Sequence, residues 1–166
     1  FFFFKLPTRK TLTKEIKHLY DVKKCSIVDM LQETKSKISI TSDGWSSFSL
    51  TPFISTTCHF FNKNLELKNI CLNIEGFPHP HNSLNIAKKI HETLKEFEIS
   101  DKVLSMTTDG APNMVNAHEQ LNNLLKLENP DRKRFVSKNW CAAHRLNLIV
   151  KNGLDSIQHN YEAVLY

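Results

Sequence analysis

The sequence predicts a mixed α/β domain in which helices flank a single mixed sheet. The order of the elements is the first observation: one helix, three β-prone runs in a meander, and then strands linked by helices. Composition is the second, because 166 residues with 40% hydrophobic and 23% charged side chains are typical of a globular domain with its own core. No low-complexity linker divides the chain.

The first helix is predicted over residues 11–35, where Ile16, Leu19 and Tyr20 keep helical spacing among lysines and glutamates. We assign residues 1–35 to an N-terminal helical lead-in and residues 36–166 to the sheet-containing domain. The chain does not begin with Met, so we do not expect its ends to be natural boundaries.

Three β-prone runs follow, over residues 38–45, 52–61 and 65–75. The third run changes the phase of its alternation between Leu67 and Ile70, which indicates a β-bulge. Next come a helix over 83–99, an almost uncharged strand over 102–109, a helix over 113–127, a strand over 134–140 and a helix over 141–154. The apolar stripe of the 83–99 helix is predicted to begin at Leu84, and Gly153 is predicted to end the last helix.

Charge and cysteines narrow the class of protein only slightly. The net charge of +5 fits a nucleic-acid partner and is equally common as a solubility charge. The four cysteines are dispersed, which favours reduced thiols in a cytosolic or nuclear protein. No apolar run approaches the ~20 residues of a membrane-spanning helix, so we expect no membrane partner.

The phrase SITSDG at residues 39–44 has a near copy, SMTTDG, at residues 105–110. Each ends a predicted strand in Asp-Gly, at Asp43 and Asp109. If the two strands run parallel, both ends lie at one edge of the sheet, and two carboxylates held together there need a cation between them. Mg²⁺ and Mn²⁺ prefer such oxygen ligands. The alternative is that each Asp-Gly is only a turn, in which the glycine lets the backbone bend sharply.

Five segments, in order, resemble hAT-superfamily transposases and their BED-zinc-finger-associated relatives. The resemblance covers roughly residues 6–155, and its segments are LPTRKTLTKEI with YD, ISITSDGWSS, PFISTTCHFF with HNSLNIAKKI, SMTTDGAPNM, and NWCAAHRLNLIVKNGL.

This resemblance implies an RNase H-like fold in which two aspartates and one glutamate bind divalent metal for DNA strand cleavage and transfer. It places Asp43 and Asp109 as the first and second catalytic carboxylates, with Mg²⁺ or Mn²⁺ as cofactor. Cys141 and His144 match the family's C-x-x-H pair near the active site and the DNA end. Arg145, beside His144, is then a candidate phosphate ligand.

The sequence also departs from the family pattern. The family glutamate follows a large helical insertion, and this chain ends at Tyr166, before that insertion. Asp155 and Glu162 stand on or beyond the last helix, where neither replaces it. We therefore expect a partial RNase H-like domain, truncated before the insertion and inactive alone.

Two other functions stay open. One is a domesticated, non-catalytic nuclear module that binds DNA or proteins, and the other is a decayed gene fragment. DNA is the expected partner both of the transposase domain and of the domesticated module. A homo-oligomer is possible for the full-length protein, and no small-molecule substrate is expected.

Several other candidates keep more than one interpretation. Trp45 is either a base-stacking residue or an aromatic at the rim of the core. A basic cluster either holds phosphates or is a solvated loop; it comprises Arg132, Lys133, Arg134 and Lys138. Cys141 and His144 lack the companion ligands of a structural zinc site, so support of the site, contact with DNA and buried packing are the main alternatives. Residues 78–81 form a turn rather than a metal-binding tract.

Overall fold

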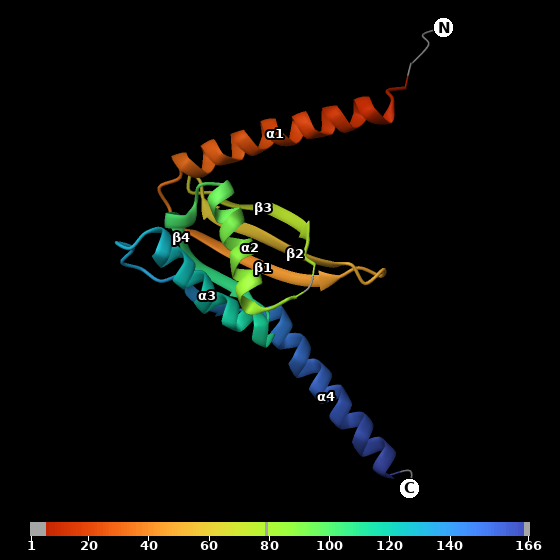
Figure 1. Cartoon of the computed structure of the whole chain (residues 1–166). Coiled ribbons are helices and arrows are strands. Elements are labelled where there is room, and N and C mark those ends of the chain that lie inside the picture. Colours follow the sequence, from red (N-terminus) through yellow and green to blue (C-terminus); the bar gives the residue numbers. More distant parts are fainter. Residues whose placement is uncertain (1–5, 79, 165–166) are drawn as a thin grey trace.

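The computed structural model describes residues 6–78 and 80–164, with side chains described through residue 157. The residues of the FFFF run and His79 lie outside these ranges. The chain forms ten elements (Figure 1): α1 (Arg9–Glu33), β1 (Ile38–Ser46), β2 (Pro52–Phe61), β3 (Leu67–Gly76), α2 (Ser83–Glu96), the 3₁₀ turn η1 (Ser100–Lys102), β4 (Val103–Thr108), α3 (Pro112–Glu128), β5 (Ser137–Trp140) and α4 (Ala142–Val164).

The five strands form one mixed sheet in the order β3-β2-β1-β4-β5. The meander β1-β2-β3 is antiparallel, whereas β4 runs parallel to both β1 and β5. The predicted mixed α/β fold is therefore confirmed. The third strand does contain a bulge, but its predicted position between Leu67 and Ile70 was wrong: pairing with β2 is regular there and skips Leu72 between Cys71 and Asn73.

The hydrophobic core lies between the sheet and the helices α2 and α3, which cover the same face (Figure 1). Strand alternation sends Ile38 and Ile40 into this core, while Ser39 and Thr41 point to the opposite face and are half-buried. Helix α2 packs through Ile86, Ala87, Ile90 and Leu94. The prediction that its buried stripe begins at Leu84 was wrong: Leu84 is exposed, because the first turn of α2 presents Ile86 to the core instead.

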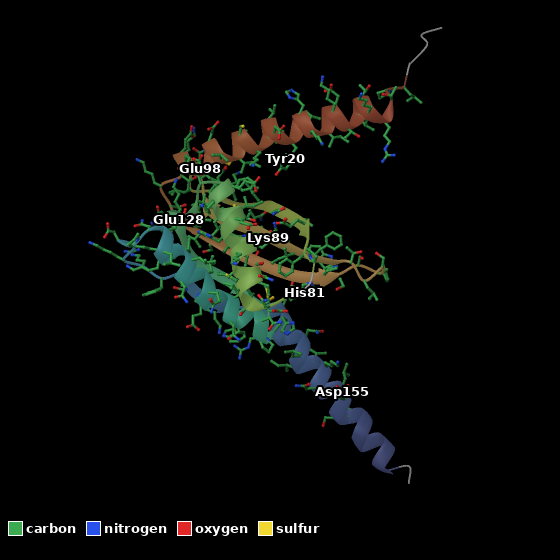
Figure 2. All side chains as sticks on the ribbon, viewed as in Figure 1. Tyr20, His81, Lys89, Glu98, Glu128 and Asp155 are labelled. Carbon is green, nitrogen blue, oxygen red and sulfur yellow. The ribbon has the colours of Figure 1, made fainter. Side chains whose placement is uncertain are left out.

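Polar contacts join helix α2 to the edge strand β3 and to helix α3. Lys89 of α2 reaches Glu75 of β3 at 2.7 Å, and this hydrogen bond raises the pKa of Lys89. Figure 2 shows Lys89 midway along α2. At the far end of the helix pair, His91 of α2 and Glu128 of α3 approach at 2.6 Å, so a polar pair joins the two helices next to their apolar seam.

Helix α1 is attached to the domain through its C-terminal half, where Lys24 pairs with Glu96 and Leu31 enters the core. Leu31 is fully buried, whereas Leu12 and Ile16 are more than half exposed, and the helix extends away from the sheet (Figure 1). The ammonium of Lys102 donates to the carbonyls of Leu31, Gln32 and Thr34 at 2.6–3.2 Å. A cation at this position satisfies carbonyls that the end of a helix leaves unpaired.

The loop between α3 and β5 is held by two side chains that bond to its backbone. Asn122, which is buried, accepts from the Val136 amide at 2.7 Å and donates to the Val136 carbonyl at 3.2 Å. The side-chain amide of Asn122 therefore makes the two backbone hydrogen bonds that a neighbouring strand would otherwise make with Val136. Arg132 donates to the carbonyls of Ser100 and Val103 at 2.7 and 3.0 Å, which ties the loop to the start of β4.

Helix α4 leaves the sheet edge and extends away from the domain (Figure 1). The predicted end at Gly153 was wrong, because the helix continues through Gly153 to Val164. Its apolar side chains from Leu146 to Ile157 are 43–69% exposed among the described residues. Within the described ranges, no helix combines the length and apolarity needed to cross a bilayer.

We expect Asn122→Leu to lower the free energy of unfolding by about 1–3 kcal/mol, because it leaves the buried N–H of Val136 without a partner, whereas the Val136 carbonyl keeps its contact with the His118 Nε2 at 2.7 Å. Leucine has a similar size, so the loss of hydrogen bonds and not a cavity dominates. Denaturant unfolding measures the change. The matched control is Asn123→Leu, the same substitution at the next, exposed position of α3, and an equal loss in both variants would contradict the role given to Asn122.

Candidate functional site

Asp43 and Asp109 lie at the same edge of the sheet on neighbouring strands. The parallel register pairs Ile40 with Met106 and Thr41 with Thr107. This pairing ends at Thr41 and Thr107, and Asp43 and Asp109 each follow two residues later, Asp43 within β1 and Asp109 just after β4. By strand alternation Asp43 lies on the face of Thr41, opposite the helices α2 and α3. The topology thus places the two aspartates on neighbouring strands, toward the same end of the parallel pair.

The two Asp-Gly pairs have different local structures. Asp43 and Gly44 are not a turn, because β1 continues through both and pairs them with Ser55 and Ile54 of β2. Asp109 follows β4, and its Oδ1 accepts from the amide of Ala111 at 3.2 Å just before α3 begins. The turn interpretation is therefore wrong for Asp43, while Asp109 stands at a strand-to-helix connection.

The two glycines do not supply unusual backbone angles. None of the described glycines has a positive φ, and a Cβ on Gly44 would meet only the Phe53 carbonyl at 3.7 Å. The sharp bend expected after each carboxylate is absent at Gly44. At Gly110 the nearest atom to an added Cβ would be on the Trp140 ring at 3.4 Å, so Gly110 leaves room for that ring.

Cys141 extends the row of site residues onto a third strand. Its amide donates to the Thr108 carbonyl at 2.8 Å, which places the end of β5 against the end of β4 beside Asp109. His144 and Arg145 follow in the first turn of α4. Cys141 and His144 are half-buried and Arg145 is exposed. Along the sheet edge the order is therefore Asp43, Asp109 and Cys141.

A metal centre with three or more ligands is not formed among the described residues, counting histidine, cysteine, aspartate and glutamate. Asp43 and Asp109 are a pair, below that number. Figure 2 shows Asp155 well along α4, away from the sheet edge, so it does not join them. The side chain of Glu162 lies outside the described residues.

A cavity of about 220 Å³ opens at the same edge. Its lining includes Gly44 and Trp45, which follow Asp43, together with Asp109 itself. The sequence analysis missed three other lining residues, Phe53, Phe77 and Asn113, and assigned His81 only to a turn. The signal for Phe53 was available, because it alternates with the buried Ile54 and faces Trp45 across the hairpin. Nothing in the spacing pointed to Asn113.

The predicted basic cluster does not form one patch at this edge. Residues 131–134 precede β5 and therefore lie at the opposite edge of the parallel strands from Asp109. The side chain of Arg132 is only 8% exposed and is bonded to backbone carbonyls, which gives it a structural role. Lys138 sits within β5, where its ammonium lies 4.4 Å from the centre of the Trp140 ring. Lys133 and Arg134 are exposed.

Comparison with protein families now decides the relationship. A family model described as the ZBED1 RNase-like domain matches residues 41–135, from within β1 to the loop before β5. The chain belongs to this RNase-like domain family. That membership agrees with the five-stranded mixed sheet and its flanking helices.

Two named relatives support the same family relationship. A Zea mays protein named as an AC transposase is 26% identical over 97% of this chain and 20% of its own length. Zinc finger BED domain-containing protein RICESLEEPER 3 of Oryza sativa subsp. japonica is 20% identical over 89% of this chain and 20% of its own length. The chain is thus a hAT-type transposase-derived protein, as its motifs predict, and it spans about a fifth of these relatives.

A third relative has a different name. A Talaromyces stipitatus protein named as the transcriptional regulator tpeD is 25% identical over 93% of this chain and 18% of its own length. Membership of the family therefore does not by itself choose between transposition and regulation.

The thiols should differ in reactivity in a way that reports the fold. Burial raises the pKa of Cys58 to about 11, while Cys25 and Cys71 are exposed and Cys141 is half-buried. At pH 8 we expect a thiol-reactive dye to label Cys25 and Cys71 quickly, Cys141 more slowly and Cys58 only after unfolding. Mass spectrometry of labelled peptides measures the order, and a Cys58→Ala variant serves as the control. Labelling of native Cys58 as fast as Cys71 would contradict the burial.

Proposed function

We propose that this domain is the metal-binding and DNA-facing part of a transposase-type nuclease site. The observation that supports the proposal is the parallel register of β1 and β4, which ends at Thr41 and Thr107, two residues before Asp43 and Asp109. Both side chains reach solvent, since Asp43 is exposed and Asp109 is half-buried. Two accessible carboxylates, one within β1 and one just after the neighbouring strand β4, would form an anionic site.

The donor set fits Mg²⁺ or Mn²⁺. Carboxylate oxygens are the ligands these ions prefer, and Mg²⁺ is commonly held by one or two carboxylates plus waters and substrate phosphates. Asp43 and Asp109 would hold the ion. Bound there, it would neutralise charge on a phosphodiester and activate a nucleophile for strand cleavage.

The neighbouring residues suit a role toward DNA in the same proposal. Arg145 is exposed one residue after His144, at the helix that begins beside Asp109, and a guanidinium there can pair with a phosphate. Cys141 and His144 would support the site or the DNA end, as the family resemblance implies. The residues of the basic loop, at the opposite edge, are not needed for this contact.

The same proposal implies that the protein acts in the nucleus, because its proposed partner is DNA. Support comes from the names of relatives, which include a transcriptional regulator and a BED-domain protein.

A second candidate is a non-catalytic nuclear module that binds DNA or protein. The specific observation in its favour is that a relative aligned over 93% of this chain is named as a transcriptional regulator. Both candidates share DNA contact, and they differ in whether the Asp43–Asp109 pair takes up a metal ion.

Metal binding is the first test. We expect Mn²⁺ to raise the melting temperature of the wild-type chain, because an ion between the two carboxylates binds the folded state selectively. Asp43→Asn and Asp109→Asn should each weaken Mn²⁺ binding about tenfold or more, measured by calorimetry. Without metal, each variant should be at least as stable as the wild type, since one of two repelling charges is removed.

The control for this test is Asp29→Asn, an exposed aspartate on α1. Its Mn²⁺ affinity should equal that of the wild type. If Asp43→Asn and Asp109→Asn also leave the affinity unchanged, the metal site is refuted and the non-catalytic module is favoured.

Catalysis is the second test. The resemblance implies a third carboxylate beyond the segment that this chain covers, so we expect the 166-residue chain to show no DNA strand transfer with Mg²⁺ or Mn²⁺. A gel assay with a labelled duplex measures the product. Clear activity that disappears in Asp109→Asn would show instead that the pair suffices.

A further inference from the structure

The three parallel strands β1, β4 and β5 carry cationic residues at their starts. Lys37 precedes β1, Lys102 precedes β4, and the loop over residues 131–134 lies shortly before β5. Because β4 runs parallel to both of its neighbours, the three starts lie at one edge of the sheet, opposite the edge with Asp43 and Asp109. Figure 1 shows the loop before β5 and the C-terminal end of α1 on the same side of the sheet.

A second cavity opens at this edge. Its volume is about 270 Å³, and it is lined by side chains from the starts of all three strands. Asp101 is the carboxylate among the described lining residues, and it already accepts from the Asn129 side chain at 3.1 Å. The cationic side chains in the lining outnumber it, and they are Lys37, Arg132, Lys133 and Arg134.

Two cations beside this cavity are held mainly by backbone carbonyls. The Lys102 ammonium donates to three of them at 2.6–3.2 Å, and the Arg132 guanidinium donates to three others at 2.7–3.0 Å. The contact of Arg132 with the carboxylate of Asp101 is longer, at 3.5 Å. Burial lowers the pKa of Lys102, and the nearby charge of Lys37 lowers it further. Carbonyls have no net charge, so the positive potential of both cations persists at this edge.

The remaining cations of the edge are accessible to a ligand. Lys37, Lys133 and Arg134 are all exposed, and none of them takes part in an ion pair among the described residues. The Lys37 ammonium donates to the carbonyl of Asp101 at 3.2 Å, which leaves two of its three N–H groups for a ligand. Asp131, an exposed carboxylate on the same loop, reduces the excess of positive charge without cancelling it.

The geometry of the strand starts favours an extended anion. Neighbouring strands lie about 4.8 Å apart, so the line from β1 across β4 to β5 is about 10 Å long. A nucleic-acid strand advances about 3.4 Å per nucleotide along the helix axis. The row of cations therefore matches about three successive phosphates, whereas a single small anion would use only part of it.

We propose that the cationic edge formed by Lys37, Lys133 and Arg134 holds backbone phosphates of DNA as a second contact, separate from the Asp43–Asp109 edge. The inference rests on the proposed DNA contact and adds another site to it. Strand β4 has 6 residues, so at about 3.3 Å per residue the two edges are about 20 Å apart. Contacts with phosphates position a duplex without reading its sequence, and this edge would hold the DNA while the chemistry takes place at the other one.

The test removes two exposed charges and leaves Arg132 in place. The double variant Lys133→Gln, Arg134→Gln is compared with the wild type by fluorescence anisotropy, with a labelled DNA duplex of mixed sequence and several salt concentrations. We expect its affinity to fall about 10- to 60-fold at about 0.1 M salt, because two phosphate contacts are lost. The slope of log affinity against log salt concentration should become shallower by about two.

The matched control is the double variant Lys88→Gln, Lys95→Gln, which removes two exposed lysines from α2 and changes the net charge equally. It should bind the duplex within about twofold of the wild type, with an unchanged salt slope. Denaturant unfolding of both double variants should match the wild type, because all four substituted side chains are exposed. The Mn²⁺ affinity of the variant at Lys133 and Arg134 should also stay the same, since the aspartates lie at the other edge.

The outcomes separate this site from the proposed function. Unchanged binding by the variant at Lys133 and Arg134, or an equal loss in both double variants, would overturn the phosphate site and leave the Asp43–Asp109 proposal standing. Failure of the wild type to bind the duplex would overturn both. A polyglutamate peptide that binds as tightly as the duplex, and loses affinity in the same variant, would identify an acidic protein segment as the partner and overturn the assignment to DNA.

Discussion

The parallel pairing of β1 with β4 is the constraint on which the rest of the structure depends. Its register, Thr41 with Thr107, decides that two aspartates separated by 66 positions share one edge. Helix α2 connects β3 to β4, so the chain returns to the end of the sheet at which β3 began, and β4 can run parallel to β1. A shift of this register by one residue would send one carboxylate to the opposite face of the sheet.

The helices and the polar anchors stabilise this pairing from the side remote from the candidate site. Arg132 and Lys102 bond to backbone carbonyls near the start of β4, and Asn122 holds the residue before β5. The buried core then fixes the strands along their length. Among the described residues neither Asp43 nor Asp109 takes part in an ion pair, and Asp109 accepts a hydrogen bond from the Ala111 amide through Oδ1.

The candidate site and the aromatic cavity are two products of the same strand ends. Asp43 is followed by Gly44 and Trp45 on β1, and Asp109 borders the cavity from β4. Asp109 and the two residues that follow Asp43 thus border one and the same cavity. The long helices α1 and α4 extend away from this region (Figure 1).

The sequence by itself determined the order of the main helices and strands and the family, because these depend on local patterns and on motifs that occur in a fixed order. It predicted a bulge in the third strand but not its position at Leu72. It singled out Asp43 and Asp109, and the topology it predicted put them at one edge. It did not determine the start of the buried stripe at Ile86, the continuation of α4 through Gly153 or the structural role of Arg132. Only the tertiary structure decided these, because each depends on which neighbour a side chain meets. The cavity is the clearest case: Trp45, Phe53, Phe77 and His81 come from separate segments, and no local spacing encodes how their rings face one another.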